Sequence, residues 1–220
     1  MKTVVLVGSG ATLVESLSSK PARDRVPPLD VTFFKLCHLA RLDGRAAVGG
    51  YMARVYGLDP FRRAYGMEEV FNLIYSDSTS ADPPRDALDA NWALLKMHRE
   101  AIIRTTNGLE CISRNGVGAL FRFLLKSNGN ALPVFMTFNH DLLIEKAIDR
   151  AVSLRRYSRT PWDISRAYEL GFEAAVTAPN GRPFAVNPEG TITSIRVLKL
   201  HGSLNWVYPV RSANDAKNSI

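Results

Sequence analysis

Three short segments of the sequence place glycines and polar side chains directly after apolar runs. Residues 8–12 read "GSGAT", residues 139–141 read "NHD", and residues 201–203 read "HGS". Glycine lets main-chain amides approach a phosphate, an asparagine carboxamide both donates and accepts hydrogen bonds, and a histidine with a pKa near about 6.5 can accept a proton. These residue types suit a site that binds and transforms a ligand.

The first segment has glycines where a strand would pass into a phosphate-binding turn. Gly8 and Gly10 follow "VVLV", and glycine amides at such a position can be presented to a pyrophosphate. The full dinucleotide fingerprint has a third glycine three residues after Gly10, where this sequence has Leu13. A tight turn that binds nothing fits the segment nearly as well.

The other two segments each leave one side chain that a structural role does not explain. Asp141 can serve as the N-cap of "LLIEKAI", with Glu145 near capping-box spacing, but one cap needs only one side chain and Asn139 remains. Asn139 could hold a ribose hydroxyl or an attacking water. A lone histidine is more often structural than catalytic, yet His201 stands before a glycine turn at a predicted strand end. Ser203 lacks the glycine-rich elbow of a serine nucleophile.

The elements that would position these segments follow from hydrophobic patterning. Apolar, β-branched runs predict three buried strands, and spacing of three to four residues predicts helices. Residues 9–30 read as a long irregular loop, a lid or a binding loop, and "SDSTSADPPRD" as a linker. Turn signals in residues 174–194 predict a short hairpin or an irregular flap. The strands are expected in "KTVVLVG", "ALPVFMTF" and "SIRVLKL", and the helices near residues 31–42 (with Asp30 as N-cap), 46–57, 67–76, 86–104, 117–126 and 141–152.

Alternating strands and helices favour an α/β domain with a parallel sheet. Ligands of open α/β sheets bind beyond the carboxyl ends of the strands. All three polar segments follow predicted strand ends, so parallel strands would bring them to one edge of the sheet.

Composition narrows the class of protein. A chain of 220 residues with 46% hydrophobic and 22% charged residues suits one soluble globular domain. No apolar run approaches the roughly 18 residues of a membrane span, and no signal peptide is recognisable, so we expect a cytoplasmic protein. Cys37 and Cys111 are far apart, which leaves neither a disulfide framework nor a zinc site.

The net charge of +7 is compatible with binding to nucleic acid, to anionic ligands or to an acidic protein. The densest basic stretch, residues 150–166, lacks the basic–aromatic alternation of a single-strand groove. A solvated face explains it best, a phosphate- or partner-binding patch comes second, and direct nucleic-acid binding has no specific support.

The order "GSGAT", "PPLD", "TFNHDLLIE" and "KLHGSLNW" resembles the sirtuin-like domain of prokaryotic anti-phage defence proteins, relatives of the NAD-consuming silent-information-regulator deacylases. The resemblance covers residues 4 to about 206, and the pairing of "TFNHDLLIE" with "KLHGS" is its specific part. It implies a Rossmann-like parallel sheet over residues 1–220 with a helical insertion at about residues 31–127. No further buried strand is expected after "KLHGSLNW", where the family fold continues. The resemblance therefore also implies a fragment or a truncated relative with an open adenine side, expected to bind NAD weakly and to cleave it slowly or not at all without a partner or further sequence.

The resemblance also assigns residues to NAD. Asn139 matches the asparagine beside the nicotinamide ribose, and His201 matches the catalytic histidine. His140 stands where the family has tyrosine or isoleucine, and no arginine matches the deacylases' Pro-Asp-Phe-Arg stretch, so neither receives a role. The residues expected to bind the cofactor are Gly8, Ser9, Gly10, Ala11, Thr12, Asp141, Gly202 and Ser203.

The activity implied is hydrolysis of NAD to nicotinamide and ADP-ribose, without a metal, in defence by NAD depletion. A sensor domain or partner protein and a homo- or hetero-oligomer are implied as well. One alternative is an NAD-dependent protein deacylase, but those enzymes usually carry a zinc ribbon that two cysteines cannot build. A second alternative is a non-catalytic sensor of NAD or ADP-ribose.

Overall fold

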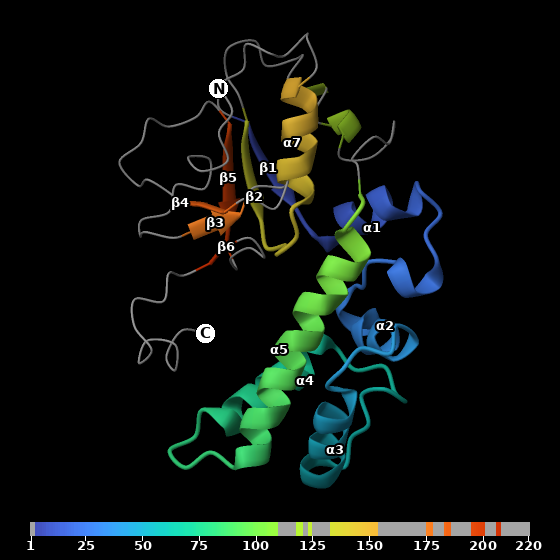
Figure 1. The fold of residues 1–220 in the computed structure, drawn as a ribbon, viewed down its shortest axis with the longest axis vertical. Helices are drawn as coiled ribbons and strands as arrows, with labels where there is room; N and C mark the ends of the chain where they lie inside the picture. The colour runs from blue at the N-terminus through green and yellow to red at the C-terminus, as the bar shows by residue number, and fades with distance from the viewer. Residues whose placement is uncertain are drawn as a thin grey trace. The chain divides into compact units, whose positions relative to one another are not determined.

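The chain divides into two compact units in the computed structural model (Figure 1). The sheet unit comprises Met1–Ala11 and Leu109–Ile220, and the helical unit comprises Thr12–Gly108. The residues that the structure describes are 3–109, 118–120, 123–124, 133–153, 175–177, 183–185, 195–200 and 206–207.

The sheet unit is built on three parallel strands in the order β1-β2-β5. Each strand is a run rich in valine and other large apolar residues, which fit a pleated, half-buried surface. The three predicted strands and their parallel arrangement are confirmed. The last residues of the strands, Val7, Thr137 and Lys199, stand in register, so the chain leaves all three at the same edge, here called the carboxyl edge. The strands are β1 (Val4–Val7), β2 (Val134–Thr137) and β5 (Arg196–Lys199).

One face of this sheet is buried beside α7 (Leu143–Ser153), which lies along it in Figure 1. Phe135 and Val197 are fully buried on neighbouring strands, and side chains two positions apart share a face of a strand. The predicted helix is confirmed, and its apolar residues recur at helical spacing. Those buried are Leu143, Ile144, Ala147, Ile148 and Ala151.

A second, antiparallel sheet has the order β4-β3-β6. The pairing of β3 (Ala175–Thr177) with β4 (Pro183–Ala185) confirms the hairpin predicted within residues 174–194. β6 (Trp206–Val207) pairs with β3 and was not predicted, because two residues are too few to show a periodic pattern.

The helical unit confirms four predicted helices. Residues 118–120 and 123–124, in the sheet unit, are helical as well, within the predicted 117–126. The described elements between β1 and β2 are α1 (Ser9–Leu17), the 3₁₀ turns η1 (Arg23–Arg25) and η2 (Asp30–Thr32), α2 (Phe33–Leu39), α3 (Arg45–Tyr56), α4 (Met67–Ser78) and α5 (Arg85–Thr106).

The prediction of an irregular loop over residues 9–30 is wrong for its first part, which forms α1. The helix carries no apolar face turned inward: its buried residues are Thr12, Glu15 and Ser16. Val14 and Leu17 are instead about half exposed, at 51% and 52%. Leu13, Val14 and Leu17 do recur at helical spacing, but the prediction gave more weight to the serine, proline and charged residues that follow them.

Asp30 caps a helix, but not the one predicted. Its Oδ1 accepts a hydrogen bond of 2.9 Å from the main-chain N–H of Glu68, in the first turn of α4. No side chain caps α2, whose preceding residues form η2 instead. A Cβ on Gly66, which precedes α4, would collide with the Asp30 carboxylate, so a larger residue there would displace the side chain that caps α4. Asp30 therefore joins η2 to α4 across the helical unit.

The core of the helical unit forms where α2, α3, α4 and α5 pack together. Its fully buried side chains are Cys37, Val48, Met52, Val70, Ile74, Ala87, Ala90, Leu94, Met97 and Ala101. Burial raises the pKa of the Cys37 thiol to about 12, so this cysteine is protonated at neutral pH.

Two tyrosines of α3 share one carboxylate of α4. The hydroxyls of Tyr51 and Tyr56 each donate a hydrogen bond of 2.5 Å to Asp77 Oδ2. Burial and then this hydrogen bond raise the pKa of Tyr51. The hydrogen bond to Asp77, followed by burial, raises the pKa of Tyr56 to about 12. Both hydroxyls therefore keep their protons at pH values where a tyrosine in the unfolded chain has ionised.

Alkaline pH should consequently destabilise the helical unit. The folded state retains protons that the unfolded state loses above pH 10. The contribution of the two tyrosines to the free energy of unfolding is therefore complete below pH 10 and is lost between pH 10 and about 12. Chemical denaturation across this range is expected to give a shallower decline for the double variant Tyr51→Phe/Tyr56→Phe than for the wild type. Tyr75→Phe, at an exposed tyrosine of α4, is the matched control. Equal declines in all three proteins would contradict the prediction.

Candidate active site at the carboxyl edge of the parallel sheet

The chain passes directly from β1 into α1 at the carboxyl edge. Gly8, Ser9 and Gly10 are exposed, and the carbonyl of Gly8 accepts a 3.0 Å hydrogen bond from the amide of Ala11. Neither glycine has a positive φ, and a Cβ on either would meet no described atom within 4 Å. The described backbone therefore does not require glycine here, and no described residue fills the space beside Gly8 and Gly10.

Position and electrostatics make this turn suitable for an anion. The first amides of an α-helix have no acceptor within the helix, and the helix dipole adds partial positive charge at that end. The first turn of α1 follows a strand end, the arrangement that binds phosphates in dinucleotide-binding folds, and the amides of Ser9 and Gly10 belong to this turn. Thr12, the last residue of the predicted glycine segment, is buried and belongs to the helical unit.

The turn after β2 is organised by side chains and backbone together. Thr137 is fully buried, and its hydroxyl accepts a 2.9 Å hydrogen bond from the main-chain N–H of Asn139. Asn139 and His140 are partly buried. Asp141 is buried, and its Oδ1 accepts a 2.9 Å hydrogen bond from the amide of Leu143, the first residue of α7. The predicted capping role of Asp141 is thus observed.

Lys199, the last residue of β5, is the largest feature that sequence reasoning missed. Its ammonium lies 3.0 Å from Glu145 Oε1, and the two side chains are 1% and 0% exposed. The same Nζ donates to the main-chain carbonyl of Asp141 and, at 3.4 Å, to that of Asn139. We call these four groups the Lys199 cluster: the Lys199 ammonium, the Glu145 carboxylate, and the carbonyls of Asn139 and Asp141.

Glu145 has a partner that the sequence did not indicate. Glu145 was expected near capping-box spacing, but its carboxylate pairs with Lys199 on β5. Removing a lysine and a glutamate from water is costly, and mutual attraction offsets that cost only when further hydrogen bonds satisfy the ammonium. The two carbonyls of the β2–α7 turn provide such acceptors, so the ion pair and the turn depend on each other.

The third polar segment begins immediately beyond β5. Leu200 donates its main-chain N–H to the carbonyl of Thr137 at 2.9 Å, which extends the pairing of β5 with β2 past the strand ends. His201, Gly202 and Ser203 lie outside the described residues, and their roles stay predictions.

The carboxyl edge therefore brings together two of the three predicted segments. The amides of Ser9 and Gly10 at the β1–α1 turn could hold an anionic group, and Asn139 follows the adjacent strand. Among the residues that the structure describes, no group of three or more histidine, cysteine or acidic side chains could hold a metal ion. Across those same residues, every helix is too short or too polar to cross a membrane.

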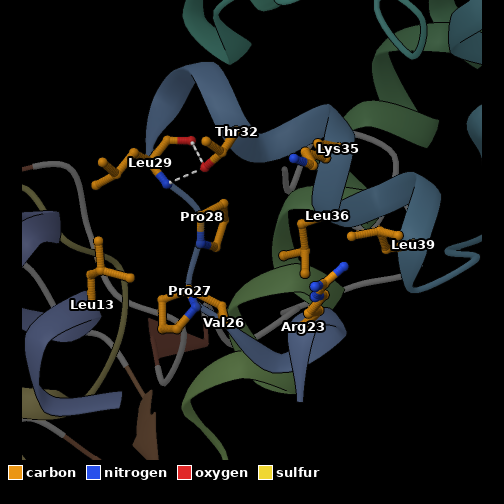
Figure 2. A pocket seen from close by; sticks show the side chains of 10 residues that line it. All are labelled: Leu13, Arg23, Val26, Pro27, Pro28, Leu29, Thr32, Lys35, Leu36 and Leu39. Atoms are coloured by element: carbon orange, nitrogen blue, oxygen red, sulfur yellow. Dashed lines mark hydrogen bonds between the residues drawn. The ribbon is translucent and has the colours of Figure 1, made fainter. Parts of the chain in front are cut away.

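A separate pocket lies within the helical unit (Figure 2). It has a volume of about 290 Å³ and mostly apolar walls, with Arg23 and Lys35 as its charged residues. The Thr32 hydroxyl bonds to the main chain of Leu29, as Figure 2 shows, and this fixes one wall. Much of the lining comes from residues 23–29, inside the stretch predicted as a lid or binding loop. The lining residues are Leu13, Arg23, Val26, Pro27, Pro28, Leu29, Thr32, Lys35, Leu36 and Leu39.

Comparison with known proteins adds no relative to this description: no protein-family model and no curated protein matches the chain.

Proposed function

We propose that this protein is a Rossmann-like, sirtuin-like NAD glycohydrolase that cleaves NAD to nicotinamide and ADP-ribose. The observation that carries the proposal is the in-register carboxyl edge of β1, β2 and β5, which two of the polar segments follow directly. The third segment begins two residues after the end of β5 in the sequence. Ligands of parallel α/β sheets bind at such an edge. Exposed glycines at the N-terminus of α1, Gly8 before its first residue and Gly10 in its first turn, support a pyrophosphate-containing ligand at the same edge.

The reaction requires little more than positioning and one proton acceptor. The bond between the ribose C1′ and the nicotinamide nitrogen breaks, nicotinamide leaves with the electron pair, and C1′ becomes oxocarbenium-like. Water adds to C1′ through its oxygen and loses a proton to His201, which gives ADP-ribose. Asn139 orients this water or the ribose hydroxyls, because its carboxamide can donate and accept at once.

The geometry of the β2–α7 turn supports this role for Asn139. Its main-chain N–H is already bonded to Thr137, and its carbonyl is bonded to Lys199, so the backbone of the residue is fixed from two sides. A fixed backbone restricts where the carboxamide can reach, which is what an orienting group needs.

The resemblance also supports a biological role, in which NAD depletion protects a bacterial population from phage. A protein deacylase is less well supported, since two cysteines cannot supply the four thiolates of a zinc ribbon. A non-catalytic NAD or ADP-ribose sensor is the alternative from another class, and the open β1–α1 turn alone would suit it.

A single assay separates these functions. The purified protein is incubated with NAD, with or without an acetyl-lysine peptide, and the products are separated by chromatography. We expect equal amounts of nicotinamide and ADP-ribose without any peptide. Nicotinamide release only with the peptide would indicate a deacylase. NAD binding by calorimetry without any product would indicate a sensor, and neither binding nor turnover would refute the proposal.

A further inference from the structure

The Lys199 cluster contains a buried ion pair, and a contribution to stability alone does not explain why charged residues occupy these two positions. An apolar pair of similar volume at the same two positions would avoid removing both charges from water, and such replacements are often neutral or stabilising. The pair is nonetheless nearly inaccessible to solvent, at 1% exposure for Lys199 and 0% for Glu145. A role in fixing the local backbone geometry would explain why a buried lysine and glutamate stand at the end of β5.

The contacts of the ammonium show what is fixed. Lys199 Nζ bonds to the carbonyls of Asn139 and Asp141, which flank His140 in the turn after β2. Glu145 stands in the first turn of α7, so the same ammonium also contacts the helix that follows the turn. One side chain on β5 thus connects the end of β2, the turn and the start of α7.

The cluster is also linked to both residues assigned to the chemistry, by a contact to Asn139 and by closeness in sequence to His201. Lys199 precedes His201 by two positions on the same chain segment and bonds directly to the main chain of Asn139. The amide of Leu200 bonds to Thr137, which provides a second link between the same two strand ends. The relative position of the β2 and β5 ends, and hence of the groups that follow them, depends on these links.

The charges of the cluster suit this role. A lysine alone would leave a positive charge beside a reaction that develops positive charge on the ribose. Glu145 offsets it at 3.0 Å, so the turn is held by a pair that is neutral overall.

We propose that Lys199 is a positioning residue, which acts through the main chain of Asn139 and Asp141 to place the β2–α7 turn against the end of β5. The catalytic part of this inference rests on the proposed NAD hydrolysis. The structural part, that Lys199 orders the turn, does not.

The experiment uses a double variant because a single one leaves an uncompensated buried charge. Lys199→Met/Glu145→Leu replaces the pair with apolar side chains of similar size and is expected to fold. Its kcat for NAD cleavage should fall roughly 10- to 100-fold with little change in KM, because ground-state contacts persist while the reacting groups are misplaced. Arg54→Met/Asp86→Leu removes an exposed ion pair between α3 and α5 and is the matched control, with wild-type kcat expected.

Hydrogen exchange of main-chain amides gives a second readout that needs no turnover. The amides of Asn139 and Leu143 bond within the turn and should exchange faster in the Lys199→Met/Glu145→Leu protein, while the amide of Ala151, late in α7, should not change. Wild-type kcat in the folded double variant would overturn catalytic positioning, and unchanged exchange would overturn ordering of the turn. If the wild-type protein does not cleave NAD, the proposed function fails, and exchange alone still decides whether Lys199 orders the turn.

Discussion

Replacement of His201 by alanine is expected to lower the rate of NAD cleavage by roughly 10²- to 10⁴-fold, equivalent to about 3 to 5 kcal/mol of activation free energy. The expectation follows from loss of the group that takes a proton from the attacking water. NAD binding should persist, because the anionic part of the ligand is assigned to the β1–α1 turn.

The measurement is the initial rate of nicotinamide release by the His201→Ala protein, together with its thermal denaturation midpoint and its NAD affinity by calorimetry. His38→Ala is the matched control, since His38 is an exposed histidine in the last turn of α2. Wild-type turnover by a folded His201→Ala protein would remove this residue from the mechanism.

Asn139→Ala should reduce turnover to a similar degree, by roughly 10²-fold or more, without unfolding the protein. The substitution deletes the carboxamide but keeps the main-chain N–H that bonds to Thr137 and the carbonyl that bonds to Lys199. The hydrogen bonds that organise the turn therefore survive, and a loss of rate reports on the side chain.

Asp141→Ala is the informative contrast. It removes the carboxylate that accepts from Leu143, so it should lower the free energy of unfolding by about 1 kcal/mol, whatever its effect on turnover. Thermal denaturation and turnover are measured on both variants. If Asn139→Ala lowers stability as Asp141→Ala does and has no selective effect on rate, Asn139 is a structural residue.

The sheet could be predicted because its signal is local. Each of β1, β2 and β5 is a short apolar run that ends at glycine or polar residues, and helices separate them, which favours parallel pairing. The candidate site followed from the same reasoning, since strand ends of a parallel sheet share an edge.

The parts that could not be predicted depend on tertiary contacts. A lysine at the end of an apolar strand is normally read as the start of solvent exposure, and the burial of Lys199 requires Glu145 from another element. Asp30 satisfies the capping rule for the helix beside it in sequence, yet it caps α4, which only the folded unit brings close. α1 buries polar residues and exposes apolar ones, whereas a surface helix usually turns its apolar face toward the core.

The pairing of β1 with β2 has a consequence for the order of events during synthesis. Val4 pairs with Val134, so β1 leaves the ribosome long before its neighbour exists, and the whole of Thr12–Gly108 is made in between. The contacts within those residues are shorter in range, and domains generally fold as units during translation at about 5 to 20 residues per second. The helical unit can thus form while β1 still presents unpaired main-chain groups. For those seconds the N-terminal strand is a site for chaperone binding or intermolecular pairing, and slower translation of residues 109–133 would prolong that exposure.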